Sequence, residues 1–109
     1  MTQTIQITTT TESREQAEKI AQALVESRLA ACVQITGPIH SVYRWQEKIE
    51  CADEWFCTIK TRQALFSKVE TSIRQLHPYQ CPEILATPIL AGSDAYLQWL
   101  AEQLDHSTD

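Results

Sequence analysis

Hydrophobic and polar positions alternate in some parts of the chain and recur every three to four residues in others. Residues 4–10 alternate isoleucine with polar, mostly threonine positions, which predicts a strand with one buried face. Residues 54–61 alternate in the same way and predict another half-buried strand. Between them, residues 30–35 form a short apolar run rich in small side chains, which is typical of a buried central strand.

Three helices follow from the positions with a period of three to four. Ser13 is expected to cap the first helix, with Gln16 in the capping-box position. Thr61 is expected to cap the second, which ends at His77 because the proline after it cannot continue a helix. Ser93 is expected to cap the last. The apolar stripes are, in chain order, Ala17, Ile20, Ala21, Leu24 and Val25; Leu65, Val69, Ile73 and Leu76; and Leu97, Leu100, Ala101 and Leu104.

A fourth strand is expected at residues 83–90. Pro82 and Pro88 cannot donate to a strand ladder, so this strand should lie at a sheet edge. The order is then strand, helix, strand, strand, helix, strand and a terminal helix. Two crossovers interleaved around a hairpin predict an α+β fold, a ferredoxin-like βαββαβ sandwich with an extra C-terminal helix. A length of 109 residues fits one such domain, residues 1–109.

The segment 41–50 is predicted to form the tip half of a long hairpin. It carries Tyr43 and Trp45, followed by a polar stretch where the chain can reverse. The pair Gly37-Pro38 interrupts the incoming strand and predicts a bulge or bend there. Such a ribbon is longer than the helices of so small a domain can cover, which favours a partner surface. The alternative is that both aromatic rings pack on the domain's own helices.

Composition removes several functional classes. A net charge of −5 disfavours a nucleic-acid partner, because phosphate contacts need a basic face. The N-terminal residues lack a basic and apolar leader pattern, and no segment is long enough to span a bilayer, so we expect a cytoplasmic protein without a membrane partner. In that compartment Cys32, Cys51, Cys57 and Cys81 are expected to be free thiols. No arrangement of nucleophile, base and orienting group stands out, so we expect no catalytic activity.

The most promising candidates for chemistry lie between residues 77 and 83. His77, Tyr79, Cys81 and Glu83 bring an imidazole, a phenol, a thiol and a carboxylate together. Imidazole and thiolate are ligands for copper and zinc, so His77 and Cys81 are the metal-ligand candidates, and they could share an ion with a group from another chain. The alternative is a structural turn in which His77 caps the second helix.

Lys60 is a separate candidate. It ends a predicted strand just before a helix, where its ammonium group could face a small anionic ligand together with the helix N-terminus. The alternative is an inter-strand or surface ion pair, for example with Glu83, which contributes little.

Seven segments of this chain resemble the CutA divalent-cation tolerance family. They are Arg28-Leu-Ala-Ala-Cys32, Tyr43-Arg-Trp45, Lys48-Ile-Glu50, Ile59-Lys-Thr61, His77-Pro-Tyr79, Pro82-Glu-Ile84 and Tyr96-Leu-Gln-Trp-Leu100. The resemblance implies a ferredoxin-like subunit in a tight homotrimer, similar in architecture to the PII signalling proteins, with the hairpins and the terminal helix building the contacts. It also implies a response to divalent metal ions, with copper(II) bound without turnover and no cofactor essential.

The chain departs from the family's metal-binding pattern. That pattern carries a cysteine at the end of the first strand and a His-His pair before Pro-Tyr, whereas this sequence has Thr9 and Leu76-His77. Gln80 also replaces a glutamate common in relatives. Of that pattern His77 remains, and Cys81 is the nearest substitute donor.

Two functional hypotheses follow. The first is a trimeric metal-responsive protein that binds copper(II) or a similar ion through His77 and nearby donors. The second is a PII-like regulatory module whose inter-subunit clefts, lined by Trp45, Lys60, Tyr79 and Glu83, bind a small anionic metabolite or a protein partner.

Overall fold

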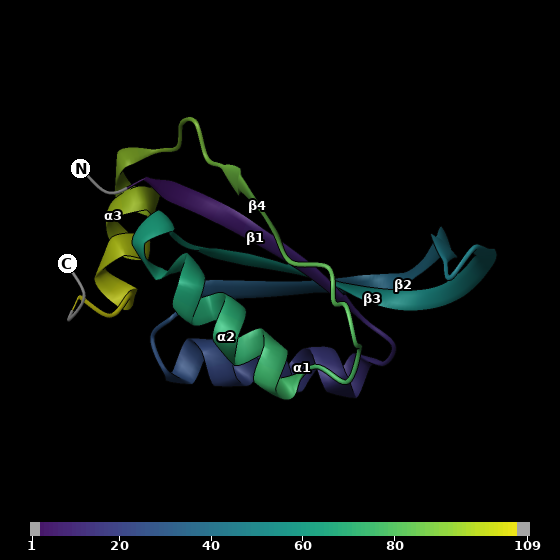
Figure 1. The fold of residues 1–109 in the computed structure, drawn as a ribbon. Helices are drawn as coiled ribbons and strands as arrows, with labels where there is room; N and C mark the ends of the chain where they lie inside the picture. The colour runs from purple at the N-terminus through teal and green to yellow at the C-terminus, as the bar shows by residue number, and fades with distance from the viewer. Residues whose placement is uncertain (1–2, 107–109) are drawn as a thin grey trace.

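A four-stranded antiparallel sheet with two helices on one face makes up most of the molecule, which we describe from a computed structural model covering residues 3–106 (Figure 1). The strands are β1 (Thr4–Thr11), β2 (Cys32–Trp45), β3 (Lys48–Arg62) and β4 (Leu85–Pro88). The helices are α1 (Arg14–Glu26), α2 (Phe66–Leu76) and α3 (Asp94–Gln103), with a 3-10 turn at Gln63–Leu65. The strand order β2-β3-β1-β4 confirms the ferredoxin-like fold, and α3 is the extra C-terminal helix.

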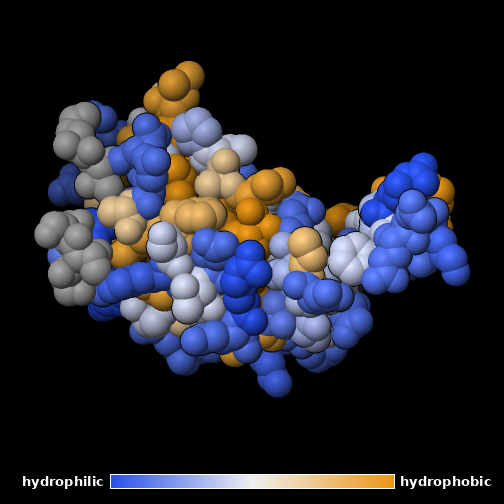
Figure 2. Space-filling model, viewed as in Figure 1, coloured by the Kyte–Doolittle hydropathy of each residue, from blue (hydrophilic) through white to orange (hydrophobic). Residues whose placement is uncertain are grey.

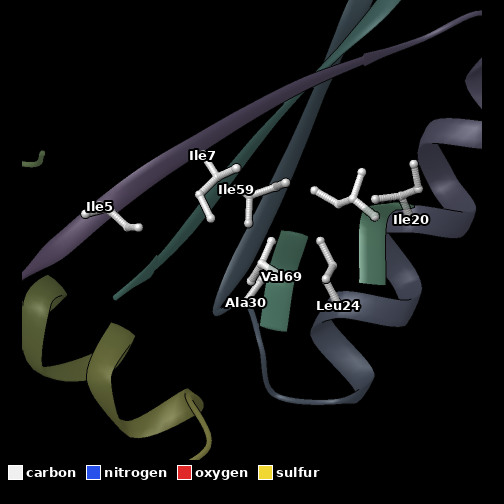
Figure 3. Packing of buried hydrophobic residues seen from close by; sticks show 8 residues of the cluster. Ile5, Ile7, Ile20, Leu24, Ala30, Ile59 and Val69 are labelled. Atoms are coloured by element: carbon white, nitrogen blue, oxygen red, sulfur yellow. The ribbon is translucent and has the colours of Figure 1, made fainter. Parts of the chain in front are cut away.

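The core lies between the sheet and the helices α1 and α2. From Thr4 to Thr9 every second residue of β1 is buried, so Ile5 and Ile7 face the helices together with Ile59 of β3 (Figure 3). The helices add Ile20 and Leu24 from α1 and, from α2, the buried residues Val69 and Ile73. Full burial of each such side chain contributes about 1.5–3 kcal/mol to folding. The apolar residues that alternate along the strands and those that recur every three to four residues along the helices therefore pack into one core, as the sequence predicts.

The helix caps agree with the sequence in two cases out of three. Ser13 Oγ accepts a hydrogen bond from the Gln16 amide at 3.1 Å, and Ser93 Oγ accepts one from the Tyr96 amide at 3.3 Å. The expected cap at Thr61 is wrong. Its hydroxyl donates to the Leu29 carbonyl at 2.7 Å, and the chain enters α2 through the 3-10 turn without a side-chain cap.

Two strand assignments need correction. The apolar run at residues 30–35 is not a central strand, because β2 lies at an edge of the sheet and begins only at Cys32. Ala30 and Ala31 are buried before the strand starts, so the small apolar residues reflect packing at its entrance. The fourth strand is shorter than residues 83–90, and it lies at the opposite edge, as the two prolines predict.

The hairpin of β2 and β3 extends beyond the helix layer (Figure 1). The ladder shifts register between Thr36 and Ile39, which confirms the bulge at Gly37-Pro38. Trp45 pairs with Lys48 across a two-residue turn, Gln46-Glu47, in which both residues have positive φ. No described helix packs against the tip of this hairpin (Figure 1). The molecule measures 44 Å along its longest axis and 26 and 23 Å along the other two.

The remaining surface features are simple. Cys32, Cys51, Cys57 and Cys81 are all free thiols. Among residues 3–106, no helix is both long and apolar enough to cross a membrane.

Candidate functional site: a cleft at the base of the hairpin

A cleft of about 670 Å³ opens where the loop between α2 and β4 meets the hairpin. The hairpin supplies one wall, the loop supplies the other, and the end of β1 closes the base. Its lining residues are Thr10, Ser41, Val42, Tyr43, Trp45, Glu54, Tyr79, Gln80, Cys81 and Glu83. The volume is in the range of ordinary small-molecule sites, about 300–1,000 Å³.

Glu54 is the buried carboxylate of this cleft. It lies on β3 opposite Ile39, directly after the bulge of β2, and only 6 % of the residue is exposed. Tyr79 donates a hydrogen bond from its hydroxyl to Glu54 Oε2 at 2.9 Å. This contact ties the loop to the base of the hairpin, so the two walls of the cleft are fixed relative to each other.

His77 fixes the loop between α2 and β4 to the end of β1. Its Nδ1 accepts a hydrogen bond from the Tyr79 amide at 3.2 Å, so in the neutral ring Nε2 carries the proton and donates to the Thr10 carbonyl at 2.6 Å. The rings of His77 and Tyr79 are also in tilted contact, with centroids 4.5 Å apart and planes at 55°. Both nitrogens of His77 are therefore occupied by the backbone, and the residue is 7 % exposed. In this arrangement the imidazole positions Tyr79 and offers no lone pair to an ion.

The surroundings of Tyr79 keep its phenol protonated. Burial raises the pKa of Tyr79 above its ordinary value, and the hydrogen bond to the Glu54 carboxylate and the repulsion from its charge raise it further. The phenol is thus a hydrogen-bond donor at neutral pH, which matches its role against Glu54.

The predicted site residues divide between the cleft and other parts of the molecule. Trp45, Tyr79, Cys81 and Glu83 line the cleft, Cys81 and Glu83 as exposed residues. Lys60 does not: its ammonium nitrogen lies 5.6 Å from the centroid of the Tyr96 ring, near α3. The lining therefore carries two carboxylates and no basic side chain among the described residues. This charge disfavours an anionic ligand in this cleft.

Glu54 and Tyr43 are cleft residues that the sequence did not assign to a site. Glu54 begins the alternating segment that predicts β3, which signals only that it faces away from the core. Its burial depends on Tyr79, which is 25 residues further along the chain. Periodicity carries no information about such a contact.

The metal-ligand donors are sparse. Within residues 3–106, no group of three or more histidine, cysteine, aspartate or glutamate side chains is placed to hold an ion. Cys81 and Glu83 remain as donors at the rim of the cleft.

Comparison with known families gives a match over most of the chain. The profile described as CutA1 divalent ion tolerance protein matches residues 5–103. The divalent-cation tolerance protein CutA of Thermus thermophilus is 46 % identical over 93 residues, which are 85 % of this chain and 90 % of that protein. The chloroplastic protein CutA of Arabidopsis thaliana is 43 % identical over 91 residues, which are 84 % of this chain but 50 % of that protein. The chain thus spans about half the length of the plant relative.

Solved structures agree with this match. The divalent cation tolerance protein Cut A1 from Thermus thermophilus superposes with a TM-score of 0.91 at 42 % identity, covering 94 % of this chain and 99 % of that one. CutA1 from Oryza sativa superposes with a TM-score of 0.93 at 33 % identity, covering 96 % of each chain.

Proposed function

This chain belongs to the CutA1 divalent ion tolerance family, and from that premise we propose that it acts as a homotrimer that binds copper(II) or a similar divalent cation without turnover. One structural observation carries the proposal: a thiol and a carboxylate, Cys81 and Glu83, are exposed at the rim of a cleft beside the overhanging hairpin. Thiolate and carboxylate together suit a borderline divalent ion.

Assembly is supported by the surface of the single chain. The hairpin exposes Val42 and Ile49, each more than 60 % accessible, and β4 exposes Leu85 to the same extent. Both β2 and β4 are edge strands with an unpaired side. Figure 2 shows apolar surface over β4 and over the segment that joins it to α3. Exposed apolar residues along unpaired edges favour contacts with further copies of the chain, in the manner of the PII proteins.

The trimer also supplies what a metal site needs. Since the described residues of one chain offer no group of three donors, the proposal places the ion between subunits, with Cys81 and Glu83 from one copy and further donors from the next. His77 contributes by holding the loop that carries both donors, since its ring nitrogens bind the backbone.

The free cysteines support a cytoplasmic location for the proposed activity. Four unpaired cysteines, two of them exposed, suit a reducing compartment, so the proposal places the protein in the cytoplasm.

The test is copper(II) titration by calorimetry on the reduced, assembled protein. Replacing Cys81→Ala should weaken copper binding about tenfold or more, because it removes a thiolate donor. Cys51→Ala is the matched control, since Cys51 is equally free and exposed but lies on the hairpin outside the cleft. Equal copper affinity in both variants would contradict the proposed site.

A further inference from the structure

We propose that the interior of the cleft binds a small organic cation, an ammonium or guanidinium group on an apolar body, through the buried Glu54 carboxylate and the rings of Tyr43, Trp45 and Tyr79. This goes beyond the metal proposal, because it uses the floor and walls of the cleft, whereas the metal donors lie at its rim.

Glu54 supplies the charge. The residue is only 6 % exposed, and removing a carboxylate from water is costly unless hydrogen bonds or an opposite charge compensate for it. Among the described residues it accepts one hydrogen bond, to Oε2 from Tyr79, and it takes part in no ion pair. Its second oxygen, Oε1, accepts no hydrogen bond from these residues and is not among their fully buried unpaired atoms, so it stays accessible from the cleft. A ligand N–H donor with a positive charge fits this accessible oxygen.

Aromatic rings supply the walls. Tyr43 and Trp45 come from the hairpin, are 45 % and 40 % exposed, and face the same cleft as Tyr79 from the loop. The face of an aromatic ring attracts a cation through its quadrupole, and this attraction grows as water is excluded.

The charge balance selects the sign of the ligand. Glu54 and Glu83 line the cleft, no described lysine, arginine or histidine does, and the chain as a whole carries a net charge of −5. An anion would meet two carboxylates, and a neutral molecule would leave Glu54 Oε1 without a charged partner. A bare divalent ion finds one carboxylate in the interior, whereas calcium or magnesium needs about six oxygen ligands.

The experiment compares three probes that share one aromatic body. Phenethylammonium, 2-phenylethanol and phenylacetate are titrated by calorimetry into the assembled wild-type protein in EDTA, which removes metal. We expect saturable binding of phenethylammonium, one per chain, and binding of the alcohol and the acid that is weaker by about tenfold or more. Equal affinity for the three probes, or no binding of phenethylammonium because another copy fills the cleft, would overturn the proposal.

Variants assign the binding to these residues. Glu54→Gln removes the charge but keeps an acceptor for Tyr79, and it should weaken phenethylammonium binding about tenfold or more. Glu102→Gln is the control: it removes the same charge at an exposed position on α3, outside the cleft, and should leave binding unchanged. Trp45→Leu tests the wall without touching Glu54 and should weaken the cation about threefold while sparing the alcohol.

The outcomes separate this proposal from the metal site. A Glu54→Gln variant that keeps wild-type affinity for the cation would overturn the inference and leave the copper proposal standing.

Discussion

At the scale of single residues, His77 positions a wall of the cleft but does not itself line the cleft. One ring nitrogen fixes the Thr10 carbonyl at the end of β1, the other fixes the Tyr79 amide, and Tyr79 in turn reaches Glu54. Hydrogen bonds of His77 and Tyr79, both in the loop, thus connect the loop to the backbone of β1 on one side and to the Glu54 side chain of β3 on the other. The histidine that most suggests a metal ligand in the sequence is a structural residue in the fold.

Replacing His77→Ala should therefore lower stability more than it lowers metal affinity. The change leaves a buried carbonyl and a part-buried amide without their partners, which costs about 1–3 kcal/mol. Urea denaturation of the variant beside the wild type measures the loss, and Cys81→Ala serves as the control with near-wild-type stability. A His77→Ala protein of unchanged stability that no longer binds copper would make His77 a metal ligand instead of a structural residue.

Cys57 gives a pH-dependent prediction. Burial raises the pKa of the Cys57 thiol to about 11 from an ordinary value of 9.0. The thiol of the unfolded chain ionises first, near pH 9.0, whereas the folded-state pKa is about 11. The contribution of the protonated thiol to folding stability is therefore complete below pH 9.0 and is lost as the pH rises through about 11. Thiol titration at neutral pH should label Cys51 and Cys81 in the native protein and Cys57 only on unfolding. Fast labelling of Cys57 in the native state would contradict its burial.

At the scale of elements, the outer half of the β2–β3 hairpin extends beyond the helix layer (Figure 1). Its directly paired residues include Arg44 with Ile49 and Val42 with Cys51, and the exposed Val42 and Ile49 lie on the same side of the ribbon. No described helix covers this side near the tip. An exposed apolar face of this kind favours burial in a subunit interface.

Ile49→Asp should weaken assembly while leaving the fold of each chain intact. A charge at an exposed position changes monomer stability by about 0.5 kcal/mol or less, but in an interface it is buried without a partner. Val25→Asp on α1 is the matched control, an exposed apolar residue in the helix layer. Light scattering should show a smaller mass for Ile49→Asp alone; equal masses for both variants and the wild type would exclude the hairpin from the interface.

Much of this element-level architecture follows from periodicity, and the exceptions have physical causes. The alternation around Ile5, Ile7 and Ile59 predicts β1 and β3 because one side of each strand must be apolar. The edge position of β2 could not be predicted, because the buried Ala30 and Ala31 just before the strand give the sequence the apolar pattern of a central strand. Thr61 has the composition of a cap, yet its hydroxyl finds the Leu29 carbonyl from another part of the chain.

At the scale of the whole molecule, the cleft is a product of topology. Residues 41–45 and 79–83 approach each other only because α2 returns the chain to the side of β1 away from β3, so that the loop passes the base of the hairpin. Cys81 and Glu83 were predictable as donors from their residue types. The partnership of Glu54 with Tyr79 was not, because it joins a strand and a loop that are 25 residues apart in the sequence.

The central claim is that copies of this chain assemble and bind a divalent cation between them, and native mass spectrometry of the reduced protein tests it most directly. Spectra are recorded without metal and with a small excess of copper(II). We expect a trimer that takes up a fixed number of ions, equal on each subunit or one for the threefold axis. A monomer, or a trimer that loads copper without reaching a plateau, would contradict the account.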